Sequence, residues 1–152
     1  MNIEKRIEEL GIVLPEAAAP AAMYVPVKKT GNLLFVSGQI PVKEGKMQFE
    51  GKAGKDKTLE EAQAAARLCA INIIAAVKGY VGDLDKVKSI VKITAFVASE
   101  TGFDKQHLVA NGASELLFDV FGEAGRHTRS AVAVNQLPLN ATVEVEAIIE
   151  VE

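Results

Sequence analysis

Alternation between apolar and charged positions divides the chain into helical and extended stretches. Apolar residues from Ile3 to Leu10 recur at helical spacing between charged residues, and Gly11 follows where a helix C-cap belongs. This pattern predicts a short surface helix over 2–10. The stretch 13–22 contains two prolines and five alanines, so we expect an extended connector that lies over the domain.

Two short strands are predicted next, over 25–27 and 33–40, with a polar turn between them that contains Gly31-Asn32. Because Pro26 cannot donate a hydrogen bond to a neighbouring strand, the first strand is expected at a sheet edge or with an irregular shape. A third short strand is predicted over 47–50.

A long amphipathic helix follows, and its apolar residues recur in steps of three and four. Thr58 and Glu61 form a capping box at its start, and Gly82 can take the left-handed conformation at its end. Cys69 falls on the apolar face and is interpreted as a buried packing residue. The face consists of Leu59, Ala62, Ala66, Cys69, Ile73, Ala76 and Tyr80.

The C-terminal half repeats the change from extended to helical spacing. Residues 87–97 are rich in β-branched side chains and predict a strand, while 104–121 predict a second long helix. Strands are predicted over 130–134 and 142–151, the latter with strict alternation. This order predicts an α+β sandwich in which two helices cover one face of a sheet.

Composition narrows the class of protein. A length of 152 residues, with 49% hydrophobic and 24% charged residues, predicts one soluble domain. The net charge of −3 and the aromatic content of 5% disfavour nucleic acid as the main partner. A single cysteine, a charged N-terminus and the lack of an apolar run of about 20 residues favour a cytoplasmic protein without a membrane span.

The common motifs of cofactor chemistry do not occur. There is no phosphate-binding loop and no dinucleotide fingerprint, and His107 and His127 form no metal-ligand pattern together. Ser37 lacks the preceding glycine of a nucleophile elbow. We therefore expect no cofactor and no metal.

The C-terminal third carries the candidate chemistry. Arg129 stands at a strand start, where its planar donor fork could orient a small carboxylic acid in a cleft. Glu144 lies on the strand face opposite Val143 and Val145, and a carboxylate beside a cleft can orient or deprotonate a water. Arg126 and His127 are interpreted as part of a solvated loop.

At this point the sequence resembles a known family, the Rid proteins (reactive intermediate deaminases), also called YjgF-like. The resemblance extends from about Ala22 to Glu152 and combines two signatures in the same order around two helices. The C-terminal signature consists of Arg129-Ser130, Leu137-Pro138 and Val143-Glu144-Val145-Glu146-Ala147. The N-terminal one consists of Tyr24, Gly31-Asn32 and Ser37-Gly38-Gln39-Ile40-Pro41.

The resemblance implies a chorismate-mutase-like fold with a mixed sheet, a homotrimer and sites in clefts between subunits. It also implies hydrolysis of imines or enamines of small amino acids, such as 2-aminoacrylate, to 2-keto acids and ammonia without a cofactor. Carried over to this sequence, Arg129 would hold the substrate carboxylate and Glu144 would position water. Tyr24, Ser37 and Gly38 would line the pocket.

Departures from the family pattern point to a divergent subgroup. Ala131 stands where many members have cysteine, and the helix and connector of residues 1–22 extend beyond the minimal pattern. Two other functions stay open beside the deaminase. One is a non-catalytic protein that binds small carboxylates, and the other is a ribonuclease or translation inhibitor, which charge and composition disfavour.

Overall fold

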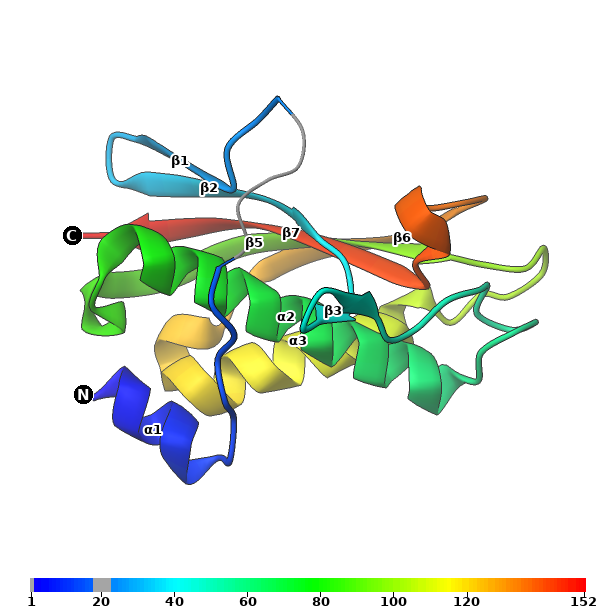
Figure 1. Ribbon diagram of the computed structural model, residues 1–152, viewed down its shortest axis with the longest axis horizontal. Helices are drawn as coiled ribbons and strands as arrows, with labels where there is room; N and C mark the ends of the chain where they lie inside the picture. The colour runs from blue at the N-terminus through cyan, green and yellow to red at the C-terminus, as the bar shows by residue number, and fades with distance from the viewer. Residues whose placement is uncertain (1, 18–22) are drawn as a thin grey trace.

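The computed structural model describes residues 2–17 and 23–152, which form a five-stranded sheet covered on one face by two long helices (Figure 1). Strands β5 and β6 run parallel and the other neighbours antiparallel, so the sheet is mixed. This confirms the predicted α+β sandwich. In spatial order the strands are β1 (Val27–Thr30), β2 (Leu33–Gln39), β7 (Val143–Val151), β5 (Val87–Ala98) and β6 (Thr128–Val134), and the helices are α2 (Leu59–Val81) and α3 (Gln106–Phe121).

Strand β7 shows why the sheet has one covered and one open face. Its alternate residues Val143, Val145, Ala147, Ile149 and Val151 are buried against the helices, as the strict alternation predicts. The residues between them face the other way, where no α-helix of the described residues covers the sheet (Figure 1). Glu144, Glu146, Ile148 and Glu150 therefore belong to the open face.

Helix α2 is the core helix of the fold. Thr58 and Glu61 form the predicted capping box, and Gly82 ends the helix with a φ of 80°. Cys69 is buried and its Sγ lies 3.6 Å from the Val143 carbonyl oxygen, which confirms its interpretation as a packing residue. Tyr80, however, is 49% exposed, because the apolar face ends one turn earlier.

By length and composition α2 is also apolar enough to cross a membrane, and it is the one such helix in the described part of the chain. Half of that apolar window is buried inside the fold, as expected of a core helix. Its neighbour α3 approaches it closely at Gly112, where a Cβ atom would collide with the main-chain oxygen of Gln63. Small residues thus set the distance between the two helices.

Two of the predicted strands lie elsewhere than the sequence indicates. The strand predicted over 25–27 begins only at Val27 and continues to Thr30, because Pro26 cannot join the ladder and the turn needs only Gly31 and Asn32. Gly31 has a φ of 56°, which favours glycine.

The strand predicted over 47–50 is wrong. A two-residue hairpin forms instead from β3 (Val42–Lys43) and β4 (Lys46–Met47), with positive φ at Glu44 and Gly45. The polar turn therefore does precede a strand, as predicted, but that strand is only Lys46–Met47 and its partner is Val42–Lys43. Glu50 contributes only an isolated bridge to Ala141.

Most of the remaining boundaries agree with the prediction or differ by one residue, and two differ by two residues. The second long helix begins at Gln106 rather than 104, and β6 begins at Thr128 rather than 130. Short 3₁₀ helices join the elements at η1 (Leu84–Lys86), η2 (Gly122–Gly125) and η3 (Pro138–Asn140).

The N-terminal extension packs onto the domain through the predicted short helix, α1 (Ile3–Glu9). Its apolar residues Ile3 and Ile7 are buried in the same hydrophobic cluster as the sheet and α2. Asn2 caps the helix by accepting a hydrogen bond from the Lys5 amide, at 3.0 Å. Of the predicted connector over 13–22, residues 18–22 lie outside the described residues.

Candidate functional site

Arg129 lies on β6 with its side chain on the helix-covered face of the sheet. It pairs with Ile93 of β5, and residues paired in a ladder point to the same face. Its Nη1 donates to Asn111 Oδ1 (2.8 Å) and to Ser114 Oγ (3.0 Å), and its Nη2 donates to the main-chain oxygen of His107 (2.9 Å). Three hydrogen bonds to α3 therefore anchor the guanidinium.

The anchored guanidinium also has N–H groups that are not bonded to α3. Of its five N–H groups, the Nε–H and one Nη2–H have no partner among the described residues. No carboxylate in that part of the chain pairs with Arg129 either. An Nε–H and an Nη–H on one edge of a guanidinium match the two oxygens of a carboxylate. Arg129 can therefore bind a small carboxylic acid while α3 holds it in place.

His127 extends this hydrogen-bond network from the loop before β6. Its Nδ1 lies 2.7 Å from the Gly125 carbonyl oxygen and its Nε2 lies 2.8 Å from Ser114 Oγ. Because a carbonyl only accepts, the ring proton is on Nδ1. In the neutral ring Nε2 then accepts the Ser114 hydroxyl proton, and the hydroxyl oxygen accepts from Arg129.

Burial lowers the pKa of His127, and the charge of Arg129 lowers it further, although the bond to Gly125 opposes both effects. The neutral ring is therefore the main form at neutral pH. The interpretation of 126–127 as a solvated loop is right for exposed Arg126 but wrong for His127, which is only partly exposed because it packs against α3.

An open cavity of about 480 Å³ lies beside this network, between α3 and the start of β6. Its wall includes an aromatic patch, where the Arg126 guanidinium lies 5.1 Å from the centre of the Phe118 ring. The residues that line it are Ser114, Glu115, Phe118, Asp119, Gly125, Arg126, His127 and Arg129. A small ligand can reach Arg129 from this side.

The second group of predicted site residues lies on the open face of the sheet. Glu144 pairs with Phe96 of β5 and lies directly over Gly38 of β2, where a Cβ atom would be only 2.6 Å from Glu144 Oε1. The register of β2 and β7 shifts between Val36 and Gln39, so Ser37 and Gly38 form an irregularity at this point. The small residue in the signature therefore makes room for the carboxylate.

The Glu144 carboxyl is about half-buried. Burial raises its pKa, and the neighbouring charge of Glu146 raises it further. A carboxylate with a raised pKa is a better proton acceptor than an ordinary surface carboxylate. Glu144 is thus suited to orient a water and take a proton from it.

Ser37 links β2 to the segment that precedes β1 and contains Tyr24. The Ser37 hydroxyl donates to the Val25 carbonyl oxygen (2.8 Å), and its amide donates to that of Pro26 (2.9 Å), which ties the segment around Tyr24 to β2. Tyr24 is 55% exposed. Ser37, Gly38 and Glu144 are therefore neighbours, while Tyr24 lies next to Val25 in the segment tied to Ser37.

One chain does not bring Arg129 and Glu144 together. Arg129 shares the helix-covered face with Ile93, whereas Glu144 shares the open face with Phe96, and the ladder runs without a shift between these positions. Since Ile93 and Phe96 are three residues apart on one strand, their side chains point to opposite faces. The two halves of the predicted site are separated by the sheet.

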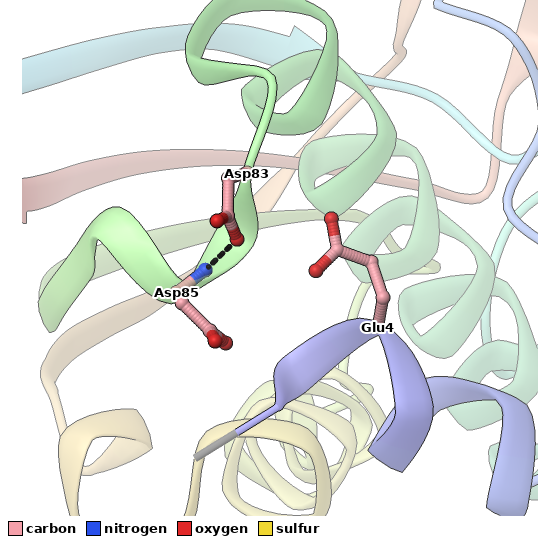
Figure 2. Close-up of side chains that lie close together, drawn as sticks. All are labelled: Glu4, Asp83 and Asp85. Carbon is pink, nitrogen blue, oxygen red and sulfur yellow. Dashed lines mark hydrogen bonds between the residues drawn. The ribbon is translucent and has the colours of Figure 1, made fainter.

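A cluster of three carboxylates lies far from these groups, where α1 meets η1 (Figure 2). Its oxygens come within 4.8 Å of one another, but they already have partners. Asp85 accepts from the Ile3 amide (2.8 Å), Asp83 from the Asp85 amide (2.9 Å), and Glu4 lies 3.9 Å from Lys78 Nζ. The cluster is explained as the attachment of α1.

Comparison with known proteins gives the family. A family model described as "YjgF/chorismate mutase-like, putative endoribonuclease" matches residues 4–151. The chain is 50% identical to a structure of a protein of unknown function from Agrobacterium tumefaciens, with a TM-score of 0.93 over 99% of this chain and 92% of that one. It is 47% identical to Protein TCP17 of Trypanosoma cruzi, over 98% of this chain and 94% of the relative.

A third relative carries an activity in its name. The 2-iminobutanoate/2-iminopropanoate deaminase of Escherichia coli K12 is 34% identical, over 86% of this chain and 90% of its own length. The chain belongs to the YjgF/Rid family. Its mixed sheet with helices on one face is the YjgF/chorismate mutase-like fold, which confirms the resemblance seen in the two signatures.

Three residues around Arg129 were not predicted as site residues. Asn111 and Ser114 are polar residues three apart on α3, and nothing in a single sequence shows which polar helix positions face a strand. His127 did offer a signal, because it precedes Arg129 by two residues and alternate positions of an extended segment share a face.

Proposed function

We propose that this YjgF/Rid protein hydrolyses small 2-imino acids and their enamine tautomers, such as 2-aminoacrylate and 2-iminopropanoate, to 2-keto acids and ammonia. The 34% identical deaminase supports this substrate class. The observation that carries the proposal is the contact between Glu144 and Gly38, because a half-buried carboxylate with a raised pKa is held over a glycine on an open surface. That arrangement suits activation of a water.

The proposed reaction needs only Arg129, Glu144 and a water molecule. The substrate carboxylate binds to the Nε–H and Nη2–H of Arg129, which orients the C=N bond. Water adds to the imine carbon as Glu144 takes its proton, and the nitrogen is protonated. The resulting amino alcohol then loses ammonia as its C–N bond breaks, and the hydroxyl loses a proton to give the keto acid. Water is the only co-reactant.

The site is complete only between two copies of the chain. Arg129 stands near the β6 edge on the helix-covered face, whereas Glu144, Gly38 and Ser37 stand on the open face. A neighbouring copy that covers the open face would bring its Arg129 to Glu144 of the first. The proposed assembly is a homotrimer, the arrangement implied by the family resemblance.

The test is ammonia release from 2-aminoacrylate generated in the assay by an enzyme that dehydrates serine. Purified protein should speed ammonia release beyond the spontaneous rate, and Arg129→Ala should abolish the gain. Tyr80→Ala, on the exposed side of α2, is the matched control and should keep it. If the wild-type protein binds pyruvate but never exceeds the spontaneous rate, it is a carboxylate-binding protein without deaminase activity.

The ribonuclease named in the family description has less support. The chain has a net charge of −3 and few aromatic residues, whereas proteins that hold RNA usually present positive grooves with stacking platforms.

For the compartment we propose the cytoplasm, where a reduced, buried Cys69 would persist.

A further inference from the structure

The proposed hydrolysis does not use the hydrogen bonds that join Ser114, His127 and Arg129. Ser114 Oγ lies between the two other side chains, 2.8 Å from His127 Nε2 and 3.0 Å from Arg129 Nη1. All three line the same open cavity. The site proposed above uses only the free edge of Arg129, so the roles of Ser114 and His127 are open.

The direction of the hydrogen bonds follows from the Gly125 carbonyl, which fixes the ring proton on Nδ1. With a neutral ring, the Ser114 proton is committed to Nε2, and the hydroxyl oxygen is free to accept from Arg129. With a charged ring, Nε2 becomes a donor, so Ser114 Oγ faces two cationic donors at once. The proton on His127 and the charge of Arg129 therefore oppose each other across one oxygen.

Charged groups of both signs surround the cavity. Glu115 and Asp119 of α3 face it, together with Arg126 at the end of η2 and Arg129 of β6. These are two carboxylates and two guanidinium groups, so their formal charges cancel. Arg126 is in addition paired with Glu123 at 3.0 Å. With Glu123 included, these groups carry one excess negative charge, but Arg129 is the charged group that lowers the pKa of His127. A carboxylate bound to Arg129 would oppose this effect and favour a proton on His127.

We infer that Ser114 and His127 are positioning residues for Arg129, and that a carboxylate on Arg129 and a proton on His127 bind cooperatively. The inference rests on the carboxylate site proposed for Arg129, but not on hydrolysis by Glu144. Because such coupling is reciprocal, the carboxylate also increases the proton affinity of His127. Substrate binding then brings a second positive charge beside the guanidinium.

Pyruvate is the probe, and its dissociation constant is measured by calorimetry at about pH 8 and about pH 5.5, on either side of the range where histidine titrates. The wild-type protein should bind about 5-fold more tightly at the lower pH, at the low end of typical coupling. His127→Gln offers the same acceptor to Ser114 without a titration, so it should lose this difference. Tyr80→Ala, on the exposed side of α2 and outside the cavity lining, should retain it.

Titration of the Glu144 carboxyl cannot explain a difference in pH dependence between these proteins, because the carboxyl is present in the wild-type protein and in every variant compared. A purely structural role for His127 is separated by rescue at about pH 8. His127→Gln should bind pyruvate more tightly than His127→Leu, which cannot accept the Ser114 proton. An NMR titration of the His127 ring gives an independent value, and its pKa should rise when pyruvate saturates the protein.

Two results overturn the inference while the proposed function stands: His127→Gln keeps the full pH dependence, or the pKa of His127 does not move with pyruvate. A different result reports on the proposed function. If Arg129→Ala binds pyruvate as tightly as the wild-type protein, Arg129 is not the carboxylate site and the coupling falls with it.

Discussion

The guanidinium of Arg129 has one part that is hydrogen-bonded to α3 and another edge that is open to a ligand. Asn111, Ser114 and the His107 carbonyl occupy three donors at 2.8–3.0 Å, which removes most of the conformational freedom of the side chain. A carboxylate that binds to the remaining edge finds a preorganised partner. The anchoring residues therefore contribute to affinity without contacting the ligand.

This explains why Arg129→Lys should not be a conservative change. Lysine keeps the charge, but one ammonium cannot reach Asn111, Ser114 and the carbonyl oxygen and also form a planar fork. Loss of one charged hydrogen bond costs about 1.5–3 kcal/mol, which weakens pyruvate binding roughly 10- to 150-fold. Calorimetry checks it, and equal affinities would show that Arg129 does not anchor the carboxylate.

Glu144→Gln should separate binding from chemistry. Glutamine has the same size and can hydrogen-bond to a water but cannot take its proton, so imine hydrolysis should slow by about 10² to 10⁴ while pyruvate affinity is retained. The measurement is ammonia release, corrected for spontaneous hydrolysis. An unchanged enzyme-dependent rate in a folded variant would leave Glu144 as an ordinary strand residue.

The same variant should be more heat-stable than the wild-type protein at neutral pH. Burial raises the pKa of Glu144 in the folded state, so the ionised form carries a cost that glutamine avoids. As the pH falls through this raised pKa, the wild-type carboxyl is protonated and the difference in melting temperature should shrink. Thermal melts at several pH values test this, and a constant difference would argue against burial as the cause.

The face of Glu144 was predictable from the alternation along its strand, but the face of Arg129 was not. Arg129 lies on β6 and Glu144 lies on β7. The relative orientation of their side chains depends on how these two strands both pair with β5. No local pattern carries that register. Sequence therefore predicted the candidate residues and could not show that they stand on opposite sides of the sheet.

At the scale of elements, the distance between α2 and α3 depends on Gly112. Helix propensity alone would make Gly112→Ala stabilising by about 1 kcal/mol. The collision with the Gln63 main-chain oxygen should reverse the sign, because overpacking against backbone costs about 1–3 kcal/mol or more. Urea denaturation measures the change.

Ala64→Gly on the exposed side of α2 is a suitable comparison, since it reports helix propensity without a change in packing. It should destabilise by about 1 kcal/mol. If Gly112→Ala proves more stable than the wild-type protein, α3 can move away from α2 and their close approach is not required.

The long helices and the alternating strands were predictable because their periodicity extends over many residues. Short elements were not, because two paired residues such as those of β3 and β4 leave no periodic signal. The hairpin there depends on positive φ at Glu44 and Gly45. Strand β1 was displaced for a related reason, since its exposed Lys28 and Lys29 look like a turn in sequence.

At the scale of the whole molecule, the uncovered face of the sheet presents exposed apolar side chains. Phe35 of β2 and Val132 of β6 are 43% and 42% exposed on that face, beside the half-buried Glu144. An apolar sheet face of this kind is normally buried by another layer. The sequence predicts two helices that cover one face of the sheet, so the other face was expected to be open. It did not predict the strand order, which places Arg129 near one edge of the sheet.

We expect a homotrimer by light scattering at micromolar concentration. Phe35→Asp would place a charge on the open face and should give monomers, whereas Tyr80→Asp, on the opposite, helical side, should remain trimeric. A wild-type protein that is monomeric would remove the site between copies. The effect of Phe35→Asp on folding is checked by circular dichroism.

The most direct test of the account is to mix two inactive variants. Arg129→Ala and Glu144→Gln are co-expressed with different affinity tags, mixed oligomers are purified through both tags, and ammonia release from 2-aminoacrylate is measured. If Arg129 of one copy works with Glu144 of another, some interfaces in the mixed oligomers join two intact residues, and activity should return although each variant alone is inactive. Mixed oligomers as inactive as the separate variants would contradict the account, because each site would then draw both residues from one chain.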